Sequence, residues 1–101
     1  MSRWKKGDTQ PDMVIDCFDG DRTRAPLDEA DLVKVIAYQR GVKKWERDVT
    51  PEAGGIVRMP LQPSDTAVPG TYFIKVYAEW PDGSHQHYPP ADEFMKMTVT
   101  R

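Results

Sequence analysis

Side chains alternate with a period of two from Thr71 to Trp80, and this pattern constrains the fold more than any other feature of the chain. Successive side chains of a β-strand point to opposite faces of a sheet, so one face of this segment would be buried. The next four residues, Pro-Asp-Gly-Ser at 81–84, predict a turn, because proline and glycine each supply a favoured turn angle. The pattern therefore predicts a hairpin whose second strand covers residues 84–88. The expected buried face holds Tyr72, Ile74, Val76, Ala78 and Trp80.

Shorter segments of the same kind recur along the chain and are separated by turn signals. The expected turns carry glycine or proline, as at Arg40-Gly41 and in residues 48–55. No sustained helical period is present, and the one possible helical stretch, residues 27–32, is too short to form a stable helix alone. Six or seven short strands predict an antiparallel sandwich or a small barrel. The other predicted strands are residues 12–18, 32–39, 42–45, 56–59 and 94–100.

Length and composition agree with one folded domain. The chain has 101 residues, of which 39% are hydrophobic and 10% aromatic, enough to bury one core but not two. No internal repeat or low-complexity segment divides it. We therefore predict a single domain over residues 1–101.

Charge and hydropathy exclude several classes of partner. Fourteen basic and sixteen acidic side chains give a net charge of −2, whereas nucleic-acid binding normally needs a basic footprint. The longest apolar stretches, such as residues 35–38, are too short to cross a bilayer. No apolar segment follows the basic N-terminus, as it would in a secretory signal. We expect no nucleic-acid partner, no membrane contact, no signal peptide and no transmembrane segment.

The segment from Asp65 to Ile74 indicates a particular architecture. In immunoglobulin-type sandwiches a tyrosine at the start of a central strand donates a hydrogen bond back to the preceding corner. Tyr72 follows an acidic residue and a glycine and begins the most regular strand of the chain, while Ile74 takes the inward position of the antibody cysteine. This predicts an all-β, immunoglobulin-like antiparallel β-sandwich of about seven short strands. The alternative is a loop and a core tyrosine in another β architecture.

Short motifs in a fixed order resemble those of a known family. They cover residues 7–11, 27–28, 65–67 with 69–72, 77–83 and 88–89. In this order they resemble the small immunoglobulin-like domains of tailed-phage virions, and they are similar in particular to the N-terminal domain of phage baseplate upper proteins. Those proteins continue into a long helical stem that is not found in this sequence, and they offer no catalytic motif to transfer.

The resemblance implies a non-enzymatic virion structural protein of the tail, tail tip or baseplate, or of the capsid surface, made in the host cytoplasm. Its implied partners are other virion structural proteins, with a homo-oligomer as one possible assembly. Aromatic side chains near termini or loops can anchor such docking. The candidate interface residues are Trp4, Trp45, Tyr88 and Phe94. The other interpretation of the same four is packing over a sheet edge within the domain.

A second class of function stays open, namely a carbohydrate- or protein-binding adaptor or adhesion module with the same β-sandwich fold. It depends on aromatic side chains that could stack on a sugar ring. The residues that suggest it are Trp45, Trp80 and Tyr88.

The chain shows little catalytic or metal-binding chemistry. His85 and His87 lie two residues apart and would share one strand face, but a zinc site needs three or four ligands. Cys17 alternates with apolar residues, which indicates a core side chain rather than a nucleophile. We therefore predict no enzyme, no cofactor and no metal site, and two solvated histidines on an outer face.

Three aspartates, Asp16, Asp19 and Asp21, lie around a glycine and suggest a calcium loop. An EF-hand loop needs a bidentate glutamate at its twelfth position, which here is Leu27. We therefore interpret the segment as a hydrogen-bonded aspartate turn.

Overall fold

The computed structural model describes residues 3–10, 12–19, 23–24, 26–52, 54–88 and 95–101. In this part of the chain it has ten β-strands, two short 3₁₀ helices and no α-helix, which confirms the all-β class. None of the helical segments among these residues is long and apolar enough to cross a membrane. Phe94 and the turn residues 20–21 lie outside the described residues.

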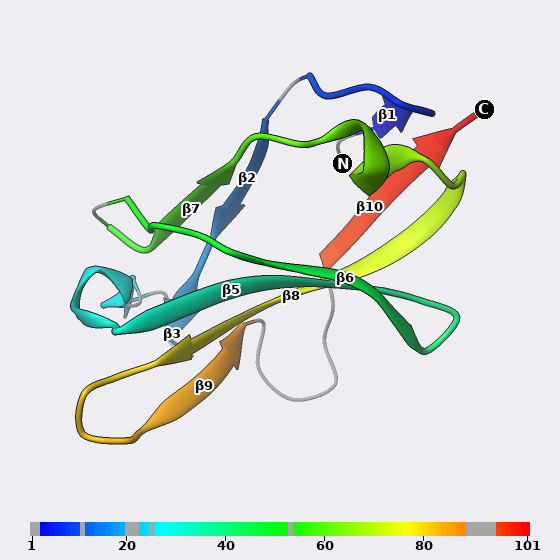
Figure 1. Ribbon diagram of the computed structural model, residues 1–101. Helices are drawn as coiled ribbons and strands as arrows, with labels where there is room; N and C mark the ends of the chain where they lie inside the picture. The colour runs from blue at the N-terminus through cyan, green and yellow to red at the C-terminus, as the bar shows by residue number, and fades with distance from the viewer. Residues whose placement is uncertain (1–2, 11, 20–22, 25, 53, 89–94) are drawn as a thin grey trace.

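Six strands form the larger sheet (Figure 1). Neighbouring strands are antiparallel, except that β1 runs parallel to β10. β8 has ten residues, and its first half pairs with β10 while its second half pairs with β9 (His85–Tyr88). The order across the sheet is β1 (Arg3–Lys5), β10 (Met95–Thr100), β8 (Gly70–Glu79), β5 (Leu32–Gln39) and β6 (Val42–Asp48).

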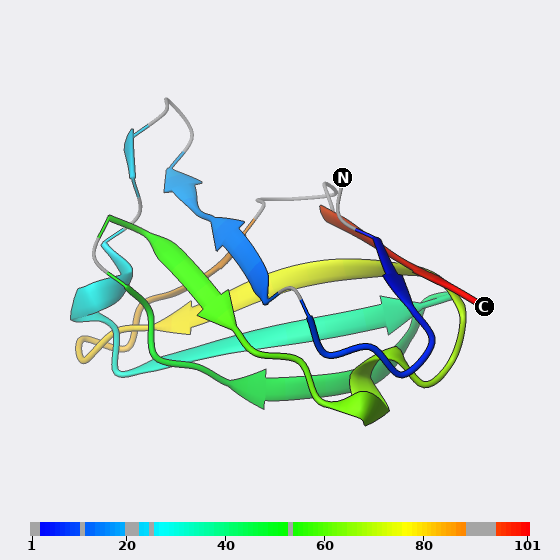
Figure 2. The same ribbon diagram turned by 90° about the horizontal axis from the view of Figure 1, so that it is seen from above.

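Two further strands make a second layer. β2 (Met13–Asp16) and β7 (Ile56–Met59) form an antiparallel pair, and β3 (Phe18–Asp19) pairs with β4 (Thr23–Arg24) in a small hairpin. Figures 1 and 2 show β2 and β7 over one face of the larger sheet. We call the face that they cover the inner face and the opposite one the outer face.

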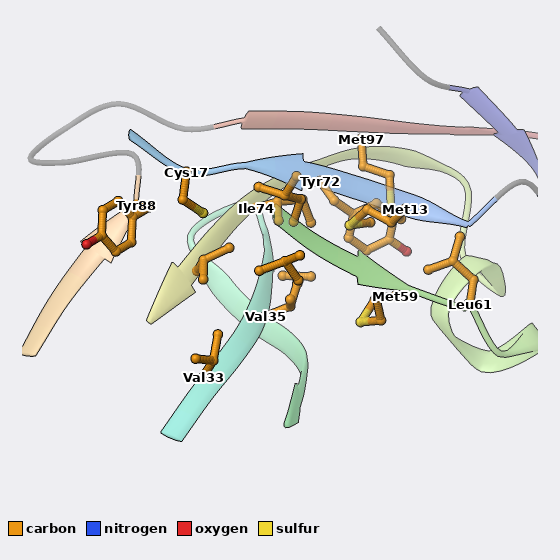
Figure 3. Close-up of a cluster of buried hydrophobic side chains, with 14 of the residues drawn as sticks. Met13, Cys17, Val33, Val35, Met59, Leu61, Tyr72, Ile74, Tyr88 and Met97 are labelled. Atoms are coloured by element: carbon orange, nitrogen blue, oxygen red, sulfur yellow. The ribbon is translucent and has the colours of Figure 1, made fainter. Parts of the chain in front are cut away.

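The hydrophobic core lies between the two layers. On β8 the predicted inward residues are at most 3% exposed from Tyr72 to Ala78, which confirms the alternation, and Trp80 is half-buried. Cys17 of the second layer is 1% exposed, as predicted. Met13 of β2 and Met97 of β10 point into the same cluster (Figure 3). Burying a Val, Leu, Ile, Phe or Met side chain fully contributes about 1.5–3 kcal/mol to stability.

The predicted tyrosine corner is present. The Tyr72 hydroxyl donates to the Val68 carbonyl over 2.6 Å, back across the turn that enters β8. The preceding 3₁₀ helix, η2 (Pro63–Thr66), also holds the N-terminal segment. Thr66 Oγ1 donates to the Asp8 carbonyl over 2.7 Å, and the Gly7 amide donates to the Thr66 carbonyl over 2.9 Å. One corner therefore orients the central strand and fixes the start of the chain.

Some elements differ from the prediction. The possible helical stretch at 27–32 is a 3₁₀ turn, η1 (Leu27–Glu29), and residues 23–24, which lie outside the predicted strands, form β4. β6 continues to Asp48, three residues past its predicted end. β1 was not predicted, because a three-residue charged segment carries no alternation signal and forms a strand only by pairing with β10.

Candidate functional site

Two of the four predicted interface residues are core residues. Trp4 on β1 is 3% exposed and Tyr88 on β9 is 2% exposed, and both belong to the hydrophobic cluster. Proximity to a terminus or loop suggested exposure, but β1 and β9 pair with β10 and β8 and turn both rings inward. For these two residues the structure agrees with packing within the domain. Phe94 lies outside the described residues.

Trp45, the third interface candidate in the described part, is half-buried on β6 and packs against the core. Its indole Nε1 is buried and has no hydrogen-bond partner among the described residues. The Arg47 guanidinium lies 5.8 Å from the centre of the ring. Cation–π attraction and apolar packing therefore hold this side chain within the domain.

The histidine pair lies on exposed positions of β9, as expected from its spacing. Both imidazole rings lie near the Tyr77 ring. The centroid of the Tyr77 ring is 6.0 Å from that of His85 and 5.0 Å from that of His87. The two imidazoles and the Tyr77 ring therefore form an aromatic cluster. Partial burial, with Lys75 and His85 as neighbouring charges, lowers the pKa of His87. No group of three or more potential metal ligands occurs among the described residues.

The outer face of the larger sheet is the strongest candidate for a docking surface. Three cross-strand pairs of β5 and β8 form its centre, and no described element lies over it (Figures 1 and 2). Three of the six side chains are aromatic and half-buried. The other three are Ile36 and Lys75, each 8% exposed, and the half-buried Lys34. The pairs are Tyr38 with Phe73, Ile36 with Lys75, and Lys34 with Tyr77.

Charged groups at one edge of this face are paired with one another and with Lys34 of its centre. Glu46 of β6 lies 3.3 Å from Lys43 Nζ and 3.7 Å from Lys34 Nζ, and these lysines lower the pKa of its carboxyl group. At another edge the Tyr77 hydroxyl donates to Glu79 Oε2 over 3.1 Å. Aromatic residues are enriched and lysines depleted in the core of a protein interface, and this centre holds three aromatics and two lysines.

The sequence contained a signal for this face that the alternation argument did not use. The positions of β8 assigned to solvent include Phe73 and Tyr77, so the strand carries large aromatics on both faces. A strand that exposes one face to solvent normally carries polar residues on that face. Aromatics on both faces therefore indicate a second surface to be covered.

A second feature is an open hollow of about 520 Å³ at the end of the β8–β9 hairpin. Of the three aromatics considered for sugar stacking, Trp80 and Tyr88 line this hollow and Trp45 does not. Polar side chains complete its wall, namely Glu29, Asp82, Ser84 and Gln86.

Comparisons with known proteins assign no family. No protein-family model matches the chain, and neither a curated protein nor a solved structure matches it at a significant level. The relationship to phage baseplate upper proteins therefore stays a prediction.

Proposed function

We propose that this chain is an immunoglobulin-like β-sandwich that acts as a non-enzymatic docking module in a phage virion, with the outer sheet face as its docking surface. The strand order supports the architecture. In variable-type immunoglobulin sandwiches one sheet contains strands G, F, C and C′ and the other pairs B with E. The corresponding neighbours here are β10, β8, β5 and β6 in one sheet and β2 with β7 in the other.

Local geometry supports the same assignment. β8 takes the place of strand F, and its Tyr72 makes the corner hydrogen bond to Val68. Ile74, two residues later, is 2% exposed in the core, where antibody domains have a cysteine. The chain departs from the variable-type pattern by the extra strand β9 and by the β3–β4 hairpin.

The observation that carries the docking function is the aromatic centre of the outer face. Tyr38, Phe73 and Tyr77 present large rigid side chains on a sheet, and such residues dominate interface energetics. The face consists of four neighbouring strands that are spaced about 4.8 Å apart and are each about 25 Å long, so its area is several hundred Å². This is the same order as the roughly 800 Å² that each partner buries in a standard interface. The virion as the place of docking is supported by the sequence resemblance alone.

Particle incorporation tests the proposal. We expect quantitative mass spectrometry to find the chain in particles purified from the strain that encodes it. Replacing Phe73 by Glu would place a charge at the centre of the docking surface, and we expect incorporation to fall at least tenfold. Val42→Glu is the matched control, because Val42 is 56% exposed at the β5–β6 turn, outside the docking centre.

Circular dichroism of both variants would verify folding before incorporation is compared. A chain that is absent from purified particles would contradict the virion role. Normal incorporation of folded Phe73→Glu would contradict the docking surface. Light scattering across a concentration series would measure the molar mass of the chain in solution. A closed oligomer indicates a ring component, and a monomer indicates docking on a larger partner.

A further inference from the structure

The hollow at the end of the β8–β9 hairpin has the chemistry of a ligand site and shares no residue with the centre of the docking surface. Its volume of about 520 Å³ is within the range of about 300–1,000 Å³ typical of small-molecule sites. It combines one half-buried tryptophan with four polar side chains from three segments of the chain. The turn, β9 and η1 thus converge on one open surface.

Trp80 is held rigidly in this wall. Its indole Nε1, the only donor of the ring, donates to the Pro26 carbonyl over 3.2 Å. Its backbone closes the hairpin turn, because its amide donates to the Ser84 carbonyl and its carbonyl accepts from the Gly83 amide, each over 2.9 Å. With its donor satisfied, the side chain has only its apolar ring to offer a ligand. A fixed ring lowers the entropy lost on binding.

The polar groups around the ring are also set in place. Asp82 Oδ1 accepts from the Ser84 amide over 2.9 Å and from Ser84 Oγ over 2.6 Å. Both bonds favour the carboxylate, so they lower the pKa of Asp82. Gln86, half-buried on β9, adds an amide donor and acceptor, and Glu29 on η1 adds an exposed carboxylate. Hydroxyl groups of a ligand would find acceptors at the turn and at η1 and both kinds of partner on β9.

The charge of the wall selects among ligands. Glu29 and Asp82 are acidic, and no lysine, arginine or histidine lines the hollow in the described part of the chain. Phosphates, sulfates and uronic acids would therefore be repelled. A neutral sugar matches both features, since its C–H face packs on an aromatic ring and its hydroxyls donate to carboxylates.

We propose that this hollow binds a neutral saccharide, with a pyranose ring stacked on Trp80 and its hydroxyls bound by Asp82, Gln86 and Glu29. The site is open to solvent, so we expect a dissociation constant on the order of 1 mM for a monosaccharide. Several copies held together would raise the apparent affinity by avidity.

The test is a titration of the full chain, followed by the ¹H–¹⁵N spectrum of the Trp80 indole and the Gln86 amide. The probes are the methyl glycosides of glucose, galactose, mannose and N-acetylglucosamine, each taken to about 50 mM, well above the expected dissociation constant. Methyl glucuronide is the anionic comparator. We expect at least one neutral glycoside to shift both signals saturably, and the glucuronide to bind at least threefold more weakly than the glucoside.

Two variants locate the binding. Gln86→Ala should weaken the best glycoside at least threefold, and Trp80→Ala, if folded by circular dichroism, should abolish binding. Trp45→Phe is the control, because Trp45 is outside the hollow, and it should bind as the parent does. The proposal is overturned if no neutral glycoside gives a saturable shift, if Gln86→Ala binds unchanged, or if the glucuronide binds more tightly than the glucoside.

Discussion

At the scale of single residues, the Tyr72 hydroxyl makes the most testable contact in the fold. The side chain is 3% exposed, and its 2.6 Å bond to the Val68 carbonyl fixes the entry of the chain into β8. Tyr72→Phe removes the donor and keeps the ring, so we expect a loss of about 1–2 kcal/mol in the free energy of unfolding. Urea denaturation measures it.

Tyr77→Phe is the matched control for this substitution. Among the described residues its hydroxyl bonds to Glu79 on the outer face, and water can replace that contact. We expect a smaller effect than at Tyr72. Equal losses from the two variants would mean that the corner hydrogen bond has no special role.

Cys17 gives a prediction about alkaline pH. Burial, with a smaller contribution from Asp16, raises the pKa of the thiol from 9.0 to about 12. The folded state therefore holds the thiol proton more tightly than the unfolded state. This contribution to stability is complete below about pH 9 and is lost as the pH rises towards about 12.

Replacing Cys17 by Ala removes this titration, so we expect the variant to lose less stability than the parent between about pH 8 and pH 10.5. Urea midpoints at the two pH values measure the difference, and the other titrating groups are common to both proteins. Equal losses would show that the thiol titrates normally. The parent thiol should also react with a thiol reagent only when the protein is unfolded.

At the scale of elements, the β5–β6 hairpin has an identifiable weak point. Gln39 pairs with Val42, so Arg40 and Gly41 form a two-residue turn, and both have positive φ angles, 54° and 77°. That geometry is a type I′ turn, which favours Asn-Gly because few L-residues tolerate positive φ. We expect Arg40→Asn to raise the free energy of unfolding by about 0.5–1 kcal/mol in urea denaturation.

Gly41→Ala is the opposite control. A Cβ at Gly41 would meet no atom within 4 Å, so its cost is that of the backbone conformation alone. We expect it to destabilise by about 1 kcal/mol. If neither substitution changes stability, the hairpin turn contributes nothing to folding.

A partly buried ion pair joins β6 to η2, with Arg47 24% exposed and Asp65 2% exposed. Two Arg47 nitrogens donate to the two oxygens of Asp65 over 2.6 and 2.7 Å. Asp65 also accepts from the Gln62 amide over 2.8 Å. Arg47→Ala would leave this carboxylate buried without its cation, and we expect a loss of about 3 kcal/mol in the free energy of unfolding.

Arg47→Lys tests the geometry of that pair, since lysine keeps the charge but cannot bond to both oxygens in a fork. In the same urea experiment we expect Arg47→Lys to lower the free energy of unfolding, but by less than Arg47→Ala does. Arg58→Ala, which breaks an exposed pair with Glu52, should have little effect. A loss at Arg47 no larger than at Arg58 would contradict a structural role for the partly buried pair.

At the scale of the whole molecule, one hydrophobic cluster joins both layers and the N-terminal strand. Most of its members come from β1, β2, β5, β7, β8, β9 and β10, and the others are Cys17, Leu27 of η1 and Leu61. A core shared in this way should unfold cooperatively, as predicted for a single domain over residues 1–101. We expect far-ultraviolet circular dichroism and tryptophan fluorescence to give coincident thermal transitions. Two separate transitions would show that the chain contains two folding units.

Local patterns predicted much of the secondary structure. Residues 32–39 and 56–59 agree with β5 and β7, and the predicted strand at 71–80 differs from β8 by one residue at each end. The inward face of β8 and the burial of Cys17 were also correct. These predictions succeed because alternation is a property of neighbouring residues, and a strand shows it whichever partner it pairs with.

The docking surface and the hollow were less accessible to the same reasoning. Proximity to termini and loops makes Trp4 and Tyr88 interface candidates although both are buried, and alternation alone does not single out Phe73 and Tyr77. The acidic and amide groups around Trp80 come from residues up to 57 positions apart, between Glu29 and Gln86. Side chains so distant in the chain meet only when the strands have found their neighbours.

By itself the sequence determined the all-β class, the central strand, the inward side chains and the tyrosine corner, because each depends on residues close together in the chain. Only the tertiary structure decided that β1 runs parallel to β10, that Arg47 pairs with Asp65, and which aromatics are buried. The physical reason is that strand pairing is non-local. Its outcome depends on how all the strands share one core, and no segment read alone contains that information.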